Sequence, residues 1–289
     1  MSDDDEQHLR FLVRTLDCFQ SFQRRAFSIS RLGGLTNRVY RLDFGSQVFV
    51  LRLSGGGTDA FINRSAECHN LKRAAALGLA PQVTYCDPEG GILVLPFLDH
   101  AESSNPGYLG RIASGLMQLH NNGEAFEGLL DPFKALALYQ TMVSDAELLV
   151  TYDMVIRQIE ALKNRWQDAR PQSCPCHGDL VAGNIIDDGA AVRFIDWEYS
   201  GMSDPAFDLA YLICETGLSS EDEAVLKTAY VPLVGDQTFW QRVSCLKPVC
   251  DGLSALWAGV RALEEPGNNA FQRMLEDRMN RAYDRLETC

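Results

Sequence analysis

The sequence predicts an α+β protein of two lobes: a small lobe with a five-stranded antiparallel sheet and one main helix, then a larger, mainly helical lobe. Two observations support this prediction. In the first hundred residues, short runs rich in β-branched and aromatic residues are separated by glycine turns. After about residue 103, apolar residues recur at helical spacing almost to the end. We place the lobes at residues 1–98 and 99–289.

The small lobe begins with an amphipathic helix over residues 6–22, whose apolar residues are spaced to lie on one face. A three-stranded meander follows, because Gly-Gly and Gly-Ser turns separate three β-rich segments near residues 27–32, 37–44 and 47–53. A helix over 60–78 ends at Gly78. Two further strands flank the turn of residues 87–91.

The large lobe is predicted to be helical apart from one short strand–turn–strand segment at residues 180–196. Its expected helices cover residues 106–121, 134–145, 150–169, 204–216, 221–230, 237–263 and 267–287.

Composition narrows the classes of function. The chain has 289 residues, a formal net charge of -13 and a pI near 4.8. Such a charge repels nucleic acid and anionic membranes, so we expect neither as a partner. No apolar run is long enough to span a bilayer. The acidic start, MSDDDEQ, is unlike a signal peptide, so we expect a cytoplasmic protein whose nine cysteines are reduced. The sequence leaves the oligomeric state open.

Cys174-Pro-Cys176-His177 is the segment closest to a metal-binding pattern. A structural zinc site needs four ligands, and no second Cys/His pair stands nearby. We therefore expect small, buried, apolar cysteines rather than a zinc site.

A glycine-rich turn joins the first two expected strands. Gly33 and Gly34 lack a Cβ, so backbone N–H groups there can approach an anion closely. The same turn supplies three polar side chains, Thr36, Asn37 and Arg38. The alternative is an ordinary hairpin turn.

Arg52 is a single cation in the otherwise apolar strand VFVLRL. It either extends to solvent or meets a buried anion, and Glu67 in the following helix is the candidate partner.

The segment HGDLVAGNIIDDGAAVRFIDWE, residues 177–198, carries three short oxygen-bearing side chains: Asp179, Asn184 and Asp196. Asn184 and Asp196 offer the hard oxygens that Mg²⁺ prefers, and Asp179 can accept a proton from a hydroxyl. The alternative is helix capping and turn chemistry. The apolar strands around the 187–190 turn favour the first interpretation, because a hairpin would bring Asn184 and Asp196 together.

The motifs HGDLVAGNII and IDWEYSGMSDPAFDLA resemble those of the aminoglycoside phosphotransferase and choline kinase superfamily, whose fold is protein-kinase-like and bilobal. LGGLTNRVYRL and the segment LVLPFLDH resemble the small lobe of its choline kinase branch. The resemblance covers residues 30–215 well and the last 75 weakly.

The resemblance implies an ATP- and Mg²⁺-dependent transfer site. In it, Asp179 is the catalytic aspartate and Asn184 and Asp196 are the Mg²⁺ ligands. Arg52 would bind phosphate beside Glu67, and the turn of residues 33–38 would cover the phosphates. The residues implied to hold the adenine edge by their backbone are Pro96, Phe97 and Leu98.

The resemblance also implies a pocket for a cationic alcohol. Trp257 matches one of two tryptophans of a choline cage, but Ser254 replaces the other and Met274 replaces a tyrosine. The carboxylates of this pocket would be Glu215, Glu198 and Asp204, with Asp179 also facing the substrate.

We therefore predict a small-molecule kinase that phosphorylates a cationic amino alcohol, with choline as the first candidate. Ethanolamine, thiamine or an aminoglycoside are alternative acceptors. A nucleotide-binding pseudokinase is the alternative outside enzymes.

Overall fold

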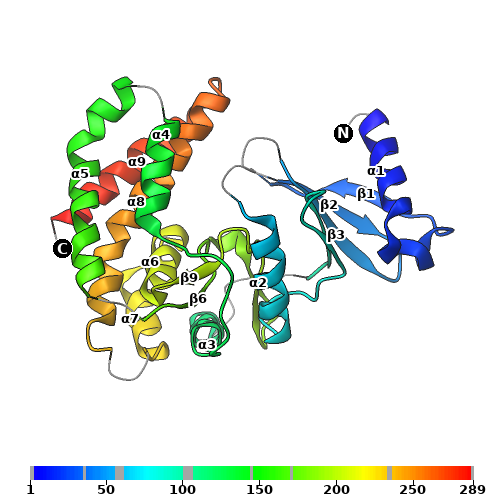
Figure 1. The fold of residues 1–289 in the computed structure, drawn as a ribbon, viewed down its shortest axis with the longest axis horizontal. Helices are drawn as coiled ribbons and strands as arrows, with labels where there is room; N and C mark the ends of the chain where they lie inside the picture. Colours follow the sequence, from blue (N-terminus) through cyan, green and yellow to red (C-terminus); the bar gives the residue numbers. More distant parts are fainter. Residues whose placement is uncertain are drawn as a thin grey trace. The chain divides into compact units, whose positions relative to one another are not determined.

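The computed structural model describes residues 3–34, 37–55, 62–99, 107–143, 146–169, 172–232 and 236–287 (Figure 1). By its internal contacts the chain divides into two compact units. One contains residues 1–106 and 186–199, and the other contains residues 107–185 and 200–289. The segment 186–199 thus belongs to the first unit although it comes late in the sequence.

The first unit contains the predicted five-stranded antiparallel sheet, in the order β1-β2-β3-β5-β4 (Figure 1). Its strands are Ser28–Arg31 (β1), Arg38–Asp43 (β2), Val48–Leu53 (β3), Tyr85–Asp87 (β4) and Ile92–Pro96 (β5). Four strands lie within the regions that the sequence predicts for them, and β4 extends one residue into the predicted turn, to Asp87. The glycine turns therefore divide this lobe where the sequence indicates.

The amino-terminal helix packs on the sheet, but it is shorter than the sequence predicts. Helix α1 is Asp3–Thr15, and a 3-10 helix, η1, covers Asp17–Phe22. Between them Leu16 has an extended backbone, with φ of -71° and ψ of 127°, which interrupts the helical hydrogen bonds. The aromatic residue Phe19 of η1 is buried among the apolar side chains of the sheet.

Helix α2, Arg64–Ala76, begins later than predicted because Asn63 is its N-cap and accepts a hydrogen bond from the Ala66 N–H at 3.0 Å. Cys68 of α2 and Cys86 of β4 form a disulfide, with Cα atoms 6.4 Å apart. The expectation of reduced thiols is therefore wrong for this pair.

The second unit is mainly helical, as predicted. Its helices are α3 (Tyr108–His120), α4 (Pro132–Met142), α5 (Ala146–Asp168), α6 (Pro205–Thr216), α7 (Ser220–Ala229), α8 (Phe239–Glu264) and α9 (Asn269–Leu286). The long helix α8 packs against α9, α6, α4 and α5, and most of its middle residues are buried (Figure 1). No helix in the described ranges has the length and apolar character needed to cross a bilayer.

Two pairs of short strands lie outside the main sheet. Strands β7 (Ile185–Asp187) and β8 (Val192–Phe194) form the predicted strand–turn–strand segment. Strands β6 (Cys174–Cys176) and β9 (Gly201–Ser203) form an antiparallel pair that the sequence does not predict. Each strand has few residues, and they include Pro175 and Gly201, which are unfavourable in strands. The sequence therefore lacks the usual pattern of a strand in both places.

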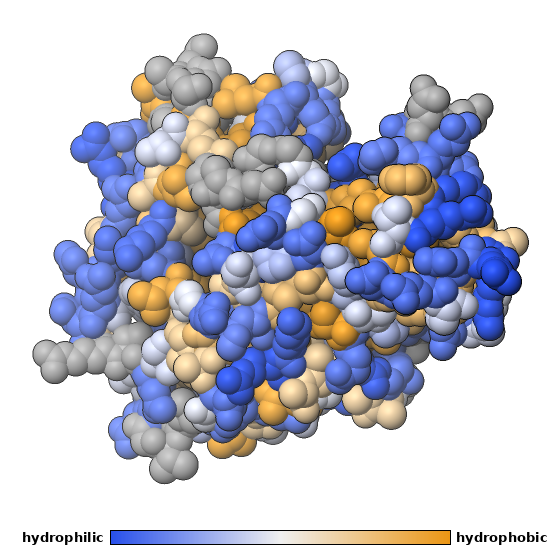
Figure 2. All heavy atoms as spheres, turned by 45° about the vertical axis from the view of Figure 1, so that its right-hand side comes forward, coloured by the Kyte–Doolittle hydropathy of each residue, from blue (hydrophilic) through white to orange (hydrophobic). Residues whose placement is uncertain are grey.

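Hydrophilic and hydrophobic residues are interspersed on the face of the molecule drawn in Figure 2. Such a mixture is ordinary for a folded protein, since apolar atoms contribute much of any accessible surface. The larger exposed apolar side chains in the described ranges, such as Phe11 and Leu129, come from several parts of the chain, and two of them, Val150 and Met154, lie one turn apart on one helix.

Candidate active site

The loop that carries Asp179 follows strand β6. Gly178 has a positive φ of 83°, a backbone conformation that glycine adopts without strain, and it turns the chain sharply before Asp179. The 3-10 helix η2, Ala182–Asn184, then brings Asn184 back toward Asp179. The Asn184 side-chain nitrogen donates to the Asp179 carboxylate and to the Asp179 carbonyl, both at 2.9 Å. The two residues are thus held in one arrangement within the second unit.

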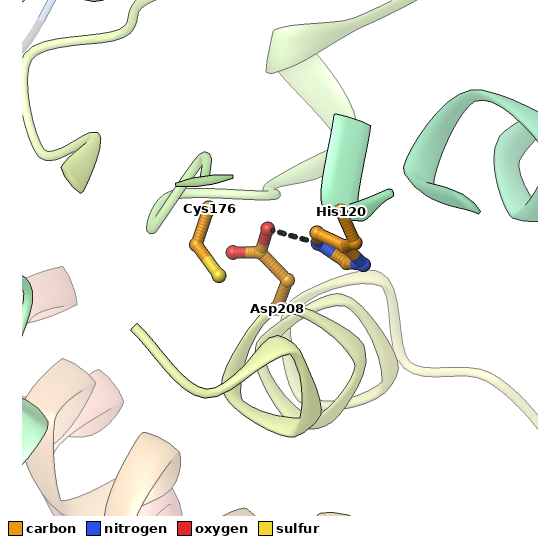
Figure 3. Close-up of side chains that lie close together, drawn as sticks. All are labelled: His120, Cys176 and Asp208. Atoms are coloured by element: carbon orange, nitrogen blue, oxygen red, sulfur yellow. Dashed lines mark hydrogen bonds and ion pairs between the residues drawn. The ribbon is translucent and has the colours of Figure 1, made fainter. Parts of the chain in front are cut away.

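A buried aspartate on α6 anchors the same loop. Asp208 accepts the backbone N–H of His177 at 2.9 Å and that of Gly178 at 2.8 Å. His120 at the end of α3 donates to the same carboxylate at 3.0 Å (Figure 3). Burial alone would raise the pKa of Asp208, but the bonds from His120 and Gly178 and the nearby imidazoles outweigh it and lower that pKa. Asp208 is therefore an ionised acceptor that positions the backbone before Asp179.

His120, Cys176 and Asp208 place one possible ligand atom each within 4.8 Å of one another (Figure 3). The residues nevertheless do not fit a metal ion. The second ring nitrogen of His120 lies 2.8 Å from the Tyr230 hydroxyl, so both imidazole nitrogens already have partners. Burial also raises the pKa of the Cys176 thiol, whereas a metal ligand must be a thiolate. The cluster is a structural hydrogen-bond network, and the segment Cys174–His177 lies inside it.

Arg52 of β3 meets two carboxylates in the first unit. One guanidinium nitrogen, Nη1, forms an ion pair with Glu67 of α2 and contacts Asp196 at 3.0 Å. Burial lowers the pKa of Arg52, but the carboxylates of Glu67, Asp196 and Glu198 outweigh it and raise that pKa above its usual value. The predicted contact between Arg52 and Glu67 is confirmed. The buried Nε of Arg52 has no hydrogen-bond partner in the described part of the chain, which fits an anionic ligand.

Asp196, just after β8, has an unusual backbone. Its φ of 64° is the one positive value at a non-glycine residue among the described residues. Such conformations cost free energy and cluster at functional sites. Its side chain remains about one-third exposed, at 32%. With this backbone conformation, the partly exposed Asp196 carboxylate contacts Arg52. Carboxylate oxygens are also suitable ligands for Mg²⁺.

Arg64 at the start of α2 is a functional candidate that sequence reasoning missed. Its Nη1 donates to Glu67 and to Glu198, each at 3.0 Å, and its Nη2 donates to Asn37 at 3.1 Å. Asn37 in turn donates to Glu198 at 2.8 Å. Glu198 is almost fully buried by these contacts, so its predicted role in substrate binding stays a prediction.

The glycine turn is described only in part. Gly34 has a φ of 109°, which requires glycine, and Gly33 has open space where a Cβ would stand. Arg38 begins β2 and is exposed. Thr36 lies outside the described residues. The predicted contact of this turn with phosphate stays a prediction.

The segment predicted to hold adenine follows β5. Pro96 ends that strand, and the Phe97 N–H donates to the Val48 carbonyl at 2.9 Å. That donor is therefore used within the sheet. Leu98 is half-buried, and an adenine contact there would rest on the remaining backbone groups.

The predicted substrate residues of the second unit have structural partners. Asp204 is the N-cap of α6 and accepts from Arg242 Nε at 2.8 Å and from Trp166 at 3.0 Å. Glu215 at the end of α6 contacts Ser254 and Arg278. Trp257 is half-buried and packs edge-on against Phe271, with ring centroids 5.8 Å apart. Met274 is half-buried on α9. Their substrate roles stay predictions.

The fold and these arrangements define a phosphotransferase of the protein-kinase-like type. The model of the phosphotransferase enzyme family matches residues 28–233, and the chain belongs to that family. The chain is 26% identical over 285 residues to Protein LicA of Haemophilus influenzae. The aligned region covers 94% of this chain and 83% of that protein.

Solved structures of similar proteins agree with this family assignment. The choline kinase LicA of Streptococcus pneumoniae superposes with a TM-score of 0.83 at 26% identity, covering 98% of this chain and 100% of the other. A choline/ethanolamine kinase family protein of Mesorhizobium loti gives the same TM-score and identity, covering 98% and 95%. Together with the family, these similarities identify the chain as a small-molecule kinase.

Proposed function

We propose that this protein is an ATP- and Mg²⁺-dependent kinase that phosphorylates the hydroxyl of a small cationic amino alcohol, with choline as the first candidate. The observation that carries the proposal is the position of Arg52 between Glu67 and Asp196. A buried guanidinium beside a partly exposed carboxylate supplies a phosphate-binding cation next to a metal-binding oxygen.

In the proposed reaction, Asp179 accepts or orients the proton of the acceptor hydroxyl, because its carboxylate is held by Asn184. Asn184 donates through nitrogen, which leaves its amide oxygen as a candidate Mg²⁺ ligand, and Asp196 is the other candidate. When bound, Mg²⁺ would neutralise the negative charge on the phosphates. Arg52 would stabilise the charge on the transferred group, so catalysis depends mainly on positioning and electrostatics.

The choice of acceptor rests on similarity and on the half-buried Trp257. A tryptophan face attracts a quaternary ammonium without a hydrogen bond. Ethanolamine is the second candidate, because one similar solved structure belongs to the choline/ethanolamine kinase family. Thiamine and aminoglycosides remain acceptors to be tested.

The test is ADP release by the purified protein with ATP and Mg²⁺, in the presence of choline, ethanolamine, thiamine or an aminoglycoside. We expect release that depends on choline. Asp179→Ala should abolish transfer while nucleotide affinity stays nearly unchanged, since the residue contacts the acceptor rather than the phosphates. If a different alcohol supports ADP release, that alcohol replaces choline as the proposed acceptor. If none of the four compounds supports ADP release although ATP binds, a pseudokinase is favoured. Substantial turnover by Asp179→Ala would refute its catalytic role.

A further inference from the structure

Three helices of the second unit bring an excess of arginine to a carboxylate that we predict to bind substrate. Glu215 lies in the last turn of α6, Ser254 lies on α8, and Arg278 lies on α9. The Ser254 hydroxyl donates to one Glu215 oxygen at 2.5 Å, and Arg278 Nη2 donates to the other at 2.7 Å. The side chains of Glu215 and Arg278 are only 7% and 12% exposed. Both carboxylate oxygens are therefore already bound within the protein.

The second carboxylate of this region does not restore a negative field. Asp251 of α8 is fully buried and faces Arg278, Arg281 and Arg285, at 3.1, 3.2 and 2.6 Å. Three guanidinium groups thus surround two carboxylates, which leaves one positive charge in excess. Such a group of charges does not attract a cation as an isolated Glu215 would.

The neutralisation of Glu215 matters for choline because a quaternary ammonium donates no hydrogen bond. Its attraction depends on nearby negative charge and on aromatic faces. Of the aromatic faces predicted for this site, Trp257 remains, while Ser254 occupies a position predicted for a second one. With Arg278 in place, Glu215 contributes little net charge to cation binding.

We propose that Arg278 is a specificity-determining residue: by neutralising Glu215 it weakens the selection for a fixed positive charge on the acceptor alcohol. This inference rests on the proposed function, because it takes Glu215 as part of the acceptor site. The alternative is a purely structural role, since Arg278 and Arg281 both donate to the Cys214 carbonyl at the end of α6, at 3.2 and 3.0 Å.

The test compares choline with 3,3-dimethylbutan-1-ol, which has the same shape but no charge. The measured quantity is the ratio of their dissociation constants, determined calorimetrically with a non-hydrolysable ATP analogue and Mg²⁺ present. In Arg278→Met we expect the preference for choline to rise about tenfold, because Glu215 loses its paired charge. Arg278→Lys keeps the charge and should keep the preference of the parent protein.

Arg281→Met is the matched control. Arg281 lies one turn further along α9 and contacts Asp251 and Cys214, but no contact with Glu215 is found among the described residues. It should raise the preference much less than Arg278→Met does, because it leaves the ion pair between Arg278 and Glu215 intact. In Arg278→Met, Asp251 keeps Arg281 and Arg285, so we expect the variant to fold, and its thermal midpoint checks this.

Three results would overturn the proposal: an unchanged preference in folded Arg278→Met, an equal rise in Arg281→Met, or no binding of either alcohol to Arg278→Met. The proposed function is decided separately, because it fails if ADP release responds to no alcohol. If the binding preference changes in Arg278→Met but no alcohol stimulates ADP release, the assignment of Arg278 is supported and the proposed function is not.

Discussion

Arg52 is the residue on which the nucleotide-binding assignment depends. Its guanidinium is buried between a fully enclosed carboxylate, Glu67, and a partly exposed one, Asp196. Removing one partner of a buried ion pair is costly because it leaves a charge without compensation. The two carboxylates nevertheless have different expected effects, since only Asp196 is exposed enough to bind a ligand as well.

Glu67→Gln should lower both stability and nucleotide affinity. The amide keeps the shape but loses the charge that fixes Arg52, so we expect the free energy of unfolding to fall by about 1–3 kcal/mol. Denaturant unfolding and nucleotide titration measure the two effects. Glu89→Gln, in the exposed turn between β4 and β5, is the control. Unchanged nucleotide affinity in Glu67→Gln would contradict a role for the Arg52–Glu67 pair in phosphate binding.

Asp196→Ala should remove the Mg²⁺ dependence of nucleotide binding with a smaller effect on stability. Titration of ATP with and without Mg²⁺ tests this. Asp188→Ala changes an exposed aspartate in the turn of the same hairpin and should behave like the parent protein. If ATP still binds more tightly with Mg²⁺ after Asp196→Ala, another residue holds the metal.

At the scale of residues, the sequence predicted the contact of Arg52 with Glu67 but missed the contacts of two other arginines. Arg52 stands out because it is a single cation in an apolar strand. Arg64 and Arg278 gave no such signal, because an arginine near the surface of a helix looks like any solvated residue. Their partners lie far away in the sequence, and a long side chain reaches them only after the elements pack.

At the scale of elements, a hydrogen bond of Asp208 joins α6 to α3 (Figure 3), and two more join α6 to the loop after β6. Asp208→Asn replaces an acceptor by a donor opposite backbone N–H groups. We expect the free energy of unfolding to fall by about 2–4 kcal/mol. We also expect kcat to fall at least about tenfold, with little change in KM for ATP, because the loop carries Asp179. Steady-state kinetics and denaturant unfolding provide the measurements. An unchanged kcat in a stable variant would exclude the positioning role.

The same carboxylate gives a pH prediction. The pKa of Asp208 is lower in the folded protein than its usual value. The stability that it contributes is therefore fully present above the unfolded pKa, about 3.9, and is lost as the pH falls through the folded pKa. The stability difference between the parent protein and Asp208→Asn should shrink below about pH 4. Asp284→Asn, at an exposed position on α9, should show no such convergence.

Elements with a strong period were predicted within a few residues, including the five strands of the sheet and the helices of the second unit. The predicted bounds of helices were wrong where the local backbone conformation or a capping residue sets the end of the helix. Leu16 interrupts the first helix, and Asn63 starts the second. Strands β6 and β9 were missed because three residues are too few to show alternation. The pairing of Cys68 with Cys86 depends on the packing of α2 near β4, which spacing alone does not reveal.

At the scale of the whole molecule, the family and fold were predictable because the motifs cover much of the chain, whereas the acceptor was not. A net charge of -13 is compatible with a cationic substrate but says little about any one site. The structure shows that the carboxylates predicted for the acceptor site, Glu198, Asp204 and Glu215, each have arginine partners. Net charge describes the whole surface, while specificity depends on which charges remain unneutralised at one position.

The late segment 186–199 has a consequence for how the protein is made. Phe194 donates its backbone N–H to the Leu79 carbonyl at 2.7 Å, and Asp196 and Glu198 contact Arg52 and Arg64. A ribosome that has released residues 1–106 has therefore not yet supplied all parts of the first unit, and almost eighty more residues must emerge first. During that interval Arg52 and Arg64 have Glu67 but lack Asp196 and Glu198, so a gene fragment cut at the apparent lobe boundary encodes an incomplete unit.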